Sequence, residues 1–341
     1  MKCAVIGAGS WGTALAMQLA RCGHDVQQWD HNAERAAAAD AARENARYLP
    51  GLPFPDGLHV TGDLAVALDG ARVVVTVVPS QVTRQVMAEL APLLPADAIV
   101  CCASKGVETG TLCTMDEVME QVLSPAHYAH SCALSGPSFA AEVARDLPTA
   151  VTIAGRDHAA TDVVADAFHG SHFRVYHTDD IIGVELGGAL KNVMAIACGI
   201  IDGAGLGLNA RAALITRGLA EITRLAVARG ANPLTMAGLA GFGDLVLTCT
   251  GNLSRNRRVG LGLGQGKKLP EILEELGQVA EGVVTTRSAR DLGIRTGVEM
   301  PITEQMYKVL YEDLSVQEAL YNLMERERKA ELDPEVARKG L

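Results

Sequence analysis

The first thirty residues follow a strand, turn, helix, strand pattern, which constrains the fold more than any other feature of the chain. The short run at 3–6 is apolar and ends at a glycine, and 12–21 places apolar side chains at helical spacing. A second strand is expected at 26–29, followed by a polar, alanine-rich helix over about 33–45. This opening predicts a β-α-β unit, in which two parallel strands are joined by a helix.

The alternation of strands and helices continues to about residue 180. The run at 73–78 (VVVTVV) is continuously apolar, as expected for a parallel strand covered on both faces, and 99–103 is similar. Further strands are expected at 151–154 and 173–176. The pattern predicts an α/β fold that begins with a Rossmann-like, doubly wound parallel sheet.

From residue 179 onward the apolar pattern becomes helical. Apolar residues recur at i, i+3 and i+4 over 181–201, 210–229 and 303–325, and strand-like runs nearly vanish. The 341 residues also exceed the roughly 250 to 300 that one hydrophobic core organises. We therefore predict a Rossmann-like domain over 1–180, an all-helical C-terminal domain over 181–330 and a frayed, charged tail over 331–341.

Charge and cysteine usage argue against several classes of protein. A net charge of −10 disfavours nucleic acid and anionic membrane surfaces as partners. The eight cysteines form no C-x-x-C pair, and we interpret them as reduced thiols in a cytosol. No export is expected, because an apolar strand stands where a signal peptide would begin. The stretch 181–201 carries Glu185, Lys191 and four glycines, which favours a buried helix over a membrane span.

The segment Gly7-Ala8-Gly9-Ser10-Trp11-Gly12 is a G-x-G-x-x-G between a predicted strand and a predicted helix. Small residues there let the backbone approach a pyrophosphate, and the helix N-terminus faces its negative charge. The first domain is therefore predicted to bind a dinucleotide.

The end of the second strand leaves the choice of dinucleotide open. Asp30 argues for NAD, because an acid there accepts hydrogen bonds from the 2′-hydroxyl and repels a 2′-phosphate. His31 beside it could tolerate that phosphate. A solvated Asp30 that caps the next helix is an equal alternative.

Two later turns are expected at the same carboxyl edge of the sheet, where ligands of open α/β folds lie. The turn at 78–81 (VPSQ) ends the strand that starts at 73, and the nicotinamide end of a dinucleotide is expected there. Lys105 follows the next strand and offers a cation to a substrate phosphate or to the cofactor. An ordinary surface lysine is the alternative.

Lys191 is the candidate proton donor. Almost every other residue in 186–195 (LGGALKNVMA) is apolar or tiny, and a buried ammonium is costly unless it is paired or used. Burial lowers the pKa of a lysine, so that it can protonate near neutral pH the alkoxide that forms when hydride adds to a ketone. A lysine that extends from the helix end to water is the alternative. Asn192 either binds a substrate hydroxyl or caps a helix.

Downstream, one carboxylate and a group of arginines complete the candidate chemistry. Asp244, in a glycine-flanked turn, could pair with Lys191 or act as a helix N-cap. The segment 252–258 (NLSRNRR) holds three guanidiniums, whose bidentate geometry suits a small phosphorylated metabolite, although a solvated charged face is the alternative. His169 and His172 have no nearby ligands in the sequence, and we assign no metal.

Five segments in order resemble the bacterial NAD(P)-dependent glycerol-3-phosphate dehydrogenase family, and the likeness runs from residue 1 to about 330. They are 7–12 (GAGSWG), 135–140 (SGPSFA), 186–192 (LGGALKN), 243–250 (GDLVLTCT) and 254–258 (SRNRR). The resemblance implies an oxidoreductase that uses NAD or NADP to interconvert dihydroxyacetone phosphate and sn-glycerol 3-phosphate. It also implies a cytoplasmic homodimer that supplies phospholipid synthesis, with neither nucleic acid partners nor stable membrane insertion.

The resemblance also implies roles for single residues, with Lys191 as catalytic proton donor and acceptor. The substrate would be held by Lys105, Gly136, Ser138, Lys191, Asp244, Ser254, Arg255 and Asn256. The cofactor would contact Gly7, Gly9, Ser10, Trp11, Gly12, His31, Lys105, Ala140, Arg255, Val279 and Glu281. In this chain Asp30 stands where many relatives carry a small or neutral residue, so tolerance of NADPH does not follow.

Two other functions compete with this one. A neighbouring two-domain dehydrogenase could act on a carboxylated hydroxy acid, because arginines also bind carboxylates. A catalytically silent dinucleotide-binding regulator could sense redox state. Such a sensor would not need a buried amine facing the nicotinamide, which is the arrangement we expect for Lys191.

Overall fold

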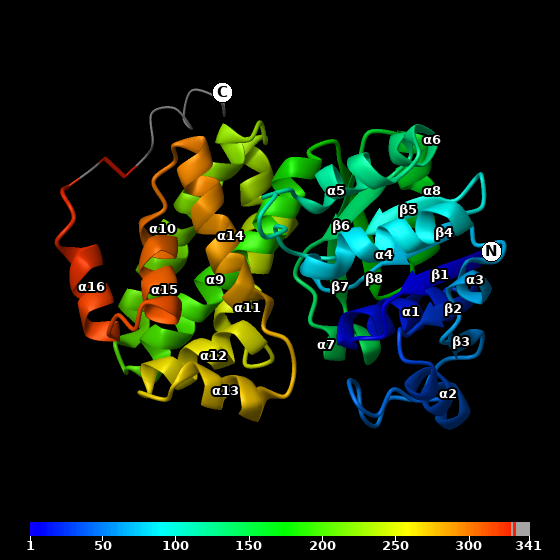
Figure 1. The fold of residues 1–341 in the computed structure, drawn as a ribbon, viewed down its shortest axis with the longest axis horizontal. Helices are drawn as coiled ribbons and strands as arrows, with labels where there is room; N and C mark the ends of the chain where they lie inside the picture. Colours follow the sequence, from blue (N-terminus) through cyan, green and yellow to red (C-terminus); the bar gives the residue numbers. More distant parts are fainter. Residues whose placement is uncertain (329, 332–341) are drawn as a thin grey trace. The chain divides into compact units, whose positions relative to one another are not determined.

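The computed structural model describes residues 1–328 and 330–331 of the chain (Figure 1). Contacts group them into two compact units, one of 1–104 with 115–181 and one of 105–114 with residues from 182 onward. The segment 105–114 thus belongs with the second unit, although it follows a strand of the first. The division into functional domains at 1–180 and 181–330 stays a prediction. The tail expected over 331–341 lies outside the described residues, apart from residue 331.

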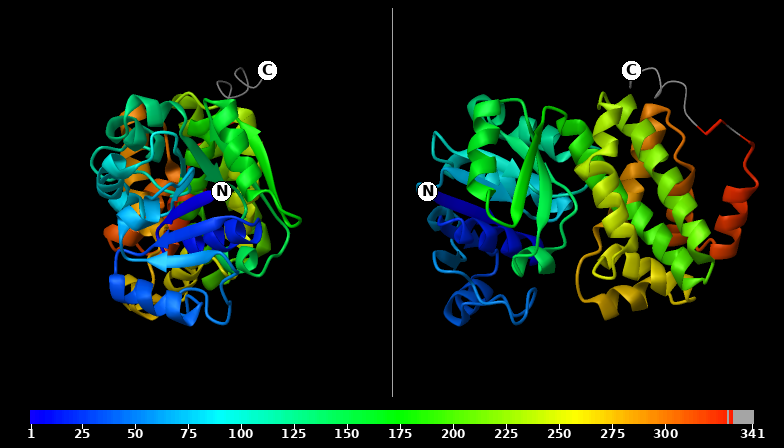
Figure 2. Two further views of the ribbon diagram at one scale, coloured as in Figure 1. Left: turned by 90° about the vertical axis from the view of Figure 1, so that its right-hand side faces the viewer. Right: turned by 180° about the vertical axis from the view of Figure 1, so that it is seen from behind.

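The first unit is built on one twisted sheet (Figures 1 and 2). Its strands are β1 (Lys2–Ile6), β2 (Asp25–Trp29), β3 (Leu58–Thr61), β4 (Val73–Thr76), β5 (Ile99–Cys102), β6 (Cys132–Ser135), β7 (Thr149–Gly155) and β8 (Phe173–Thr178). Their order is β3-β2-β1-β4-β5-β6-β7-β8. Neighbouring strands run parallel except β6 and β7. The doubly wound α/β prediction is confirmed, with this antiparallel pair as a departure.

Helices cover both faces of this sheet. They are α1 (Ser10–Arg21), α2 (Ala33–Ala42), α3 (Leu64–Leu68), η1 (Ser80–Val82), α4 (Thr83–Leu90), η2 (Ala91–Leu93), α5 (Met115–Val122), α6 (Pro125–Ala129), α7 (Ala140–Ala144) and α8 (His158–Phe168). Cys3 and Val5 of β1 pack into one core with α1 and α8. Side chains alternate along a strand, so Ala4 and Ile6 point to the other face, where α3, α4 and α5 contact one another.

Some elements of the first unit differ from the prediction. The helix expected over 33–45 ends at Ala42, because Arg43 adopts a left-handed conformation with φ 53°. Strands β3 and β6 were not predicted, since each is only four residues long and β3 alternates between buried and exposed positions. Short strands of this kind give little periodic signal.

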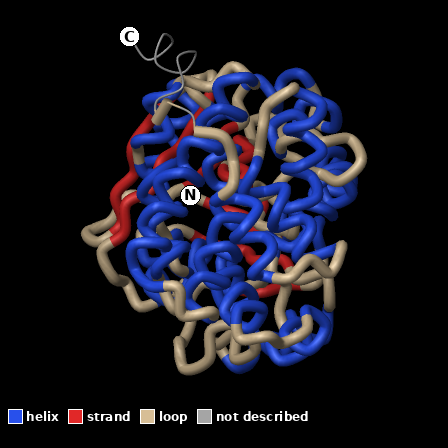
Figure 3. Tube along the Cα trace, turned by 90° about the vertical axis from the view of Figure 1, so that its left-hand side faces the viewer, coloured by secondary structure: helices blue, strands red, loops and turns tan. Residues whose placement is uncertain are grey.

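The second unit is helical, as predicted, and helices make up most of the whole trace (Figure 3). Its elements are α9 (Ile181–Gly203), α10 (Gly207–Ala228), η3 (Pro233–Ala237), η4 (Leu239–Gly243), α11 (Asp244–Thr250), α12 (Arg255–Gly264), α13 (Leu269–Leu276), α14 (Glu281–Thr296), α15 (Pro301–Tyr311) and α16 (Val316–Met324). The single helix expected over 303–325 is two helices. Asp313 is left-handed, and Ser315 starts α16 through a capping box with Glu318.

Helix α9 forms the core of this unit. Among the described residues it alone is long and apolar enough to cross a membrane, yet 94% of its most apolar window is buried inside the protein. Leu186, Leu190, Val193 and Ala197 all join the core cluster of the unit. This burial is typical of a core helix and agrees with the predicted buried helix at 181–201.

Helices α9 and α12 touch backbone to backbone. A Cβ built on Gly199 would lie 2.1 Å from the carbonyl oxygen of Arg257, and one on Gly260 would lie 1.9 Å from that of Ile196. Both distances are far below a van der Waals contact, so only glycine fits. The contact repeats one turn further along each helix, at Gly203 and Gly264.

Candidate active site

The glycine-rich turn lies at the topological switch point of the sheet. Strand β1 pairs with β2 on one side and β4 on the other, so the strand order reverses beside it. Gly7 has φ +124°, and a Cβ there would lie 2.5 Å from the carbonyl oxygen of Val77 in the loop after β4. A Cβ on Gly12 would lie 2.0 Å from the Gly7 oxygen, whereas one on Gly9 would meet nothing within 4 Å. Gly7 and Gly12 allow the tight turn, and Gly9 keeps its outer face open.

This turn fits a dinucleotide pyrophosphate. Helix α1 begins at Ser10, and its N-cap Gly9 has no side chain to satisfy the first amides. Those amides and the helix dipole favour an anion at this end. The indole Nε1 of Trp11 is buried and has no hydrogen-bond partner among residues 1–328 and 330–331. The backbone amides of the turn therefore offer the donors that a bound phosphate group needs.

The other predicted cofactor residues of the first unit lie at loop and helix starts. Ser10 donates its hydroxyl to the Tyr48 carbonyl over 3.3 Å. The side chain of His31 is 74% exposed just after β2, and Ala140 is the first residue of α7. Their contacts with a dinucleotide stay predictions.

The amine of Lys191, the carboxylate of Asp244 and the amine of Lys105 form one cluster within the second unit. Lys191 and Asp244 make a direct ion pair, and Lys105 Nζ lies 2.7 Å from Asp244 Oδ2. Only 8% of the Lys191 side chain and 1% of the Asp244 side chain are exposed. One carboxylate therefore holds two amines in a nearly dry site.

The pKa of Lys191 is strongly shifted. Burial, which penalises the charged form, lowers it from its usual 10.5 to about 7. The Asp244 carboxylate opposes this change in pKa, and the Lys105 ammonium adds to it. An amine with this pKa gives and takes a proton at neutral pH, as a general acid and base must.

Asp244 is the first residue of α11, and the N-cap position before it belongs to Gly243. The π-helical turn η4 leads into it, and a Cβ on Gly241 would collide with Met236. Thr248, one turn on, donates to the Asp244 backbone oxygen over 2.6 Å and lies 3.4 Å from Oδ1. The glycine-flanked turn thus places the carboxylate next to Lys191, which is the first of the two predicted alternatives.

The starts of α12 and α14 meet beside Lys191. Ser254 caps α12 by accepting from the Arg257 amide over 3.2 Å. Asn256 Oδ1 accepts from the Gly282 amide over 2.9 Å. A Cβ on Gly282 would lie 2.7 Å from the carbonyl oxygen of Asn192, the neighbour of Lys191. Gly282 is therefore the point where Asn192 and Asn256 meet the start of α14. The segment of Val279 and Glu281 leads directly into it.

The three arginines of α12 have different surroundings. Arg257 donates to Asp202 Oδ2 through Nε at 3.0 Å and Nη2 at 2.6 Å, so it is committed to the fold rather than to phosphate. Arg255 is half-buried, with Nη1 3.4 Å from Gln278 Oε1. Arg258 is exposed. Arg257 is therefore unsuited to the predicted phosphate contact. Phosphate binding by Arg255 and Arg258 stays a prediction, and Arg255 is the half-buried one of the two.

Gly136 and Ser138, the predicted substrate contacts in the first unit, follow β6. Gly136 has φ +144°, and a Cβ there would lie 2.9 Å from Val151 Cα in β7. The Ser138 hydroxyl donates to the Gly136 carbonyl over 3.0 Å. This closed turn explains the glycine, and the contact of both residues with substrate stays a prediction.

The sequence reasoning missed several residues that shape the site. Asp202 engages Arg257, and it also accepts from Arg211 Nη1 over 3.1 Å. Arg295 donates to the carbonyls of Thr111 and Leu112 over 2.7 and 3.0 Å, which ties the 105–114 segment to α14. Of these residues, only Thr248 could have been found from the sequence. It lies four residues after Asp244, a spacing that brings two side chains of a helix together.

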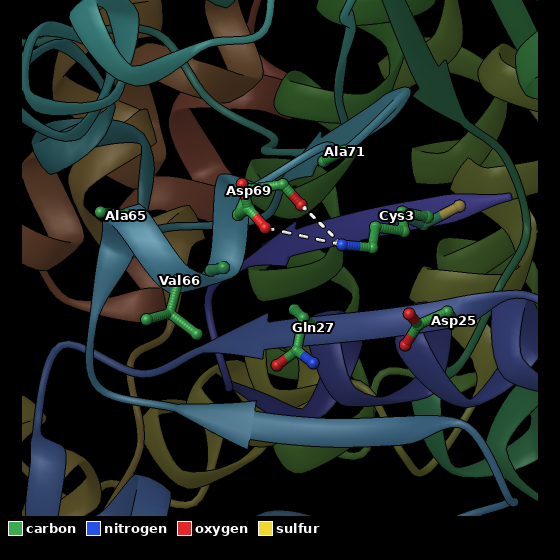
Figure 4. Close-up of a pocket in the computed structure, with 9 residues that line it drawn as sticks. Cys3, Asp25, Gln27, Ala65, Val66, Asp69 and Ala71 are labelled. Carbon is green, nitrogen blue, oxygen red and sulfur yellow. Dashed lines mark hydrogen bonds and ion pairs between the residues drawn. The ribbon is translucent and has the colours of Figure 1, made fainter.

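A surface pocket of about 420 Å³ lies at the opposite, amino end of β1 and β2 (Figure 4). Lys2 pairs with Asp69 across it at 3.5 Å, and both side chains are largely exposed. Ala65, Val66 and Gln27 also line it. Ligands of open α/β sheets bind at the carboxyl ends of the strands, so this pocket is not the dinucleotide site.

No group of three or more metal-binding side chains is found in the part of the chain that the structure describes. His172 pairs with Asp146 at 3.0 Å. The eight cysteines, all within the described ranges, are free thiols.

Comparison with known proteins matches nearly the whole chain. Residues 2–161 match the family model of the NAD-dependent glycerol-3-phosphate dehydrogenase N-terminus, and 180–321 match that of its C-terminus. Curated proteins named glycerol-3-phosphate dehydrogenase [NAD(P)+] from Geobacter sp. (strain M21) and Anaeromyxobacter sp. (strain K) are each 56% identical. The matches span 330 and 334 residues, 97% of this chain in both cases, and 98% and 100% of the relatives.

Solved structures agree. A crystal structure of glycerol-3-phosphate dehydrogenase from Coxiella burnetii is 44% identical with a TM-score of 0.91, covering 95% of this chain and 99% of that one. A ketopantoate reductase from Ralstonia eutropha is 16% identical with a TM-score of 0.57, over 91% of this chain and 97% of that one, which shows a shared fold alone. The chain therefore belongs to the NAD-dependent glycerol-3-phosphate dehydrogenase family.

Proposed function

We propose that this protein interconverts dihydroxyacetone phosphate and sn-glycerol 3-phosphate, with NAD or NADP as its redox cofactor. The observation that carries the proposal is the buried amine of Lys191, whose pKa of about 7 suits proton transfer at neutral pH. Relatives that are named for this activity and share 56% of their residues over almost the full length support it.

The chemistry divides between the cofactor and this chain. A bound nicotinamide dinucleotide supplies hydride to the carbonyl carbon of the ketone. Lys191 Nζ donates a proton to the carbonyl oxygen and takes it back from the hydroxyl in the reverse direction. Asp244 holds that amine in place, and Lys105 shares the carboxylate. Because about half of an amine with a pKa near 7 is protonated at pH 7, Lys191 serves both directions.

The phosphate of the substrate is assigned to the start of α12. Arg255 there offers a guanidinium that binds phosphate oxygens in a bidentate manner. Asn256 Oδ1 already accepts a hydrogen bond from the Gly282 amide. The Nδ2 donors of Asn256 are therefore the part of the side chain suited to a phosphate or hydroxyl oxygen. Further substrate contacts are proposed for Gly136, Ser138 and Ser254.

The cellular setting is a further part of this proposal. We assign the protein to the cytoplasm, as a homodimer that supplies glycerol 3-phosphate to phospholipid synthesis. The name of the relative from Geobacter sp. (strain M21), which matches 97% of this chain, supports the supply of glycerol 3-phosphate. For the dinucleotide we propose contacts within the first unit, with the glycine turn, Ser10, Trp11, His31 and Ala140. The contacts that the resemblance implies for Lys105, Arg255, Val279 and Glu281 stay predictions.

Initial rates test the proposal. Purified protein should oxidise NADH or NADPH when dihydroxyacetone phosphate is added, and it should ignore the keto form of a 3-hydroxy acid. Lys191→Ala should lower turnover by roughly 10² to 10⁴ with cofactor binding nearly unchanged. Lys267→Ala, which removes an exposed lysine paired with Glu275, is the control and should keep full activity.

Three results would contradict the proposal. Reduction of the keto acid without reduction of dihydroxyacetone phosphate would favour the carboxylate-specific dehydrogenase. Full turnover by Lys191→Ala would remove Lys191 from the chemistry. Binding of the dinucleotide without turnover of either substrate would favour the redox-sensing regulator.

A further inference from the structure

The carboxylate of Asp30, which follows β2, is already engaged by its own chain. Its Oδ1 accepts from the Asn32 amide over 2.9 Å and from Arg35 Nη2 over 2.6 Å. Its Oδ2 accepts from Arg35 Nε over 3.2 Å. Only 8% of the Asp30 side chain is exposed. Asp30 and Arg35 thus form a bidentate ion pair at the end of the strand.

This pairing changes what Asp30 can do. An acid at this position selects NAD when it accepts hydrogen bonds from the ribose hydroxyls and repels a 2′-phosphate. Here three donors occupy a carboxylate that has about four acceptor sites, and the guanidinium compensates its charge. The basis for rejecting a 2′-phosphate is therefore largely removed.

Two basic groups, His31 and Arg35, reach the surface at this edge, next to the exposed Glu34 in the first turn of α2. The Arg35 side chain is 30% exposed, and that of His31 is 74% exposed. Arg35 Nη2 lies 3.2 Å from His31 Nε2. The two N–H groups of Arg35 Nη1 have no partner among residues 1–328 and 330–331.

The ion pair does not serve simply to start α2. Asn32 already caps that helix, because its side chain accepts from the Arg35 amide over 2.8 Å. Arg35 lies in the first turn of α2, where a cation is unfavourable next to the helix dipole. Arginine is a cation at any physiological pH, and the hydrogen bond to Asp30 raises the pKa of the Arg35 guanidinium further. Because Asp30 holds Nε and Nη2, Nη1 is the part of the guanidinium that is suited to donate to an anion from outside the chain.

We propose that Arg35 makes this dinucleotide site accept a 2′-phosphate, so that the protein binds NADP(H) despite the acid at Asp30. Asp30 is a positioning residue that holds the guanidinium. The inference rests on the proposed dinucleotide site of the first unit, and it needs no assumption about the reduced substrate. Asp30, His31 and Arg35 all belong to that unit.

Equilibrium binding tests the inference separately from turnover. The dissociation constants of NADPH and NADH are measured by nicotinamide fluorescence, and displacement by 2′,5′-ADP is compared with displacement by ADP. Arg35→Gln should weaken NADPH and 2′,5′-ADP by about tenfold or more, as expected for a lost charge-assisted hydrogen bond. NADH and ADP should change less than about threefold, and Arg35→Lys should lie between. The control Arg174→Gln removes an equal charge from β8 of the same unit, where Arg174 lies over the Tyr176 ring, and should leave all four constants unchanged.

Three outcomes in the binding constants, and a fourth in the fold, would overturn the inference. The three are equal weakening of NADPH and NADH by Arg35→Gln, unchanged NADPH binding in that variant, and a wild-type protein that binds NADH but not NADPH. If both glutamine and lysine at position 35 abolish both cofactors, Arg35 serves the fold and the inference also fails. Failure of the proposed function looks different, because the wild type would then bind a dinucleotide normally and leave dihydroxyacetone phosphate unchanged.

Discussion

Replacing Asp244 by asparagine tests whether the shared carboxylate sets the proton affinity of Lys191. The change keeps the size of the side chain but removes its charge, which leaves Lys191 beside Lys105 without a counter-charge. Two unit charges about 3 Å apart, at an effective dielectric constant of about 20, interact by about 5 kcal/mol. One pKa unit corresponds to about 1.36 kcal/mol, so the pKa of Lys191 should fall by up to about 4 units, and by at least about 2 after local rearrangement.

The assay is the pH profile of kcat/KM for dihydroxyacetone phosphate with saturating reduced cofactor. Reduction needs the protonated amine, so the wild-type profile should turn downward above a pH of about 7. In Asp244→Asn the turn should move to about pH 5 or below. Titration of the substrate phosphate is common to both proteins, so the difference between the profiles reports on Lys191.

The loss of rate at pH 7 follows from the same shift. With a pKa lowered by two units, about 1% of the amine is protonated instead of about half, so about 50-fold fewer molecules are competent. A more acidic ammonium transfers its proton faster, which offsets part of this loss. Glycerol 3-phosphate oxidation should fall by the same factor at the same pH when cofactor binding is unchanged, because the equilibrium constant links the two directions. A profile that still turns near pH 7, with activity lost, would refute the reasoning.

Two further substitutions test the start and the packing of α12. Arg255→Lys should raise the KM for dihydroxyacetone phosphate several-fold, because a lysine lacks the bidentate geometry. The control Arg258→Lys, at an exposed position, should leave the KM unchanged. Equal KM values for the two variants in steady-state kinetics would count against phosphate contact at Arg255. Gly260→Ala places a Cβ 1.9 Å from the Ile196 oxygen and should lower the free energy of unfolding by about 1 to 3 kcal/mol or more, and an unchanged melting temperature in calorimetry would contradict this backbone contact.

The parts of the site that the sequence predicts well are those with a strong local signal. Lys191 is conspicuous because burying a lone cation among apolar residues is costly unless it is paired or used. The glycine turn is conspicuous because the strand before it and the helix after it both have clear apolar patterns. Asp244 was recognisable from its glycine-flanked turn. In each case the residues that carry the signal lie within about ten positions of one another.

The parts that the sequence did not predict depend on contacts between distant segments. Arg257 looks like Arg255 in the sequence, and only Asp202, 55 residues earlier, separates their roles. Likewise, nothing in 105–114 indicates that Arg295 ties it to the helical unit. Arg35 lies only five residues after Asp30. Even so, the sequence does not predict which hydrogen bonds Asp30 accepts, because that depends on the side-chain conformations.

The glycine contact between α9 and α12 has a consequence for how the selectivity of this protein can change. Main-chain atoms, rather than adjustable side chains, set the spacing of the helix that carries Lys191 and the helix that begins at Arg255. Side chains elsewhere in the core can repack around a substitution without altering the spacing of α9 and α12. A longer phosphorylated ketone would therefore have to be accommodated by loops such as 277–280, because the two helices themselves cannot move apart without losing their contact.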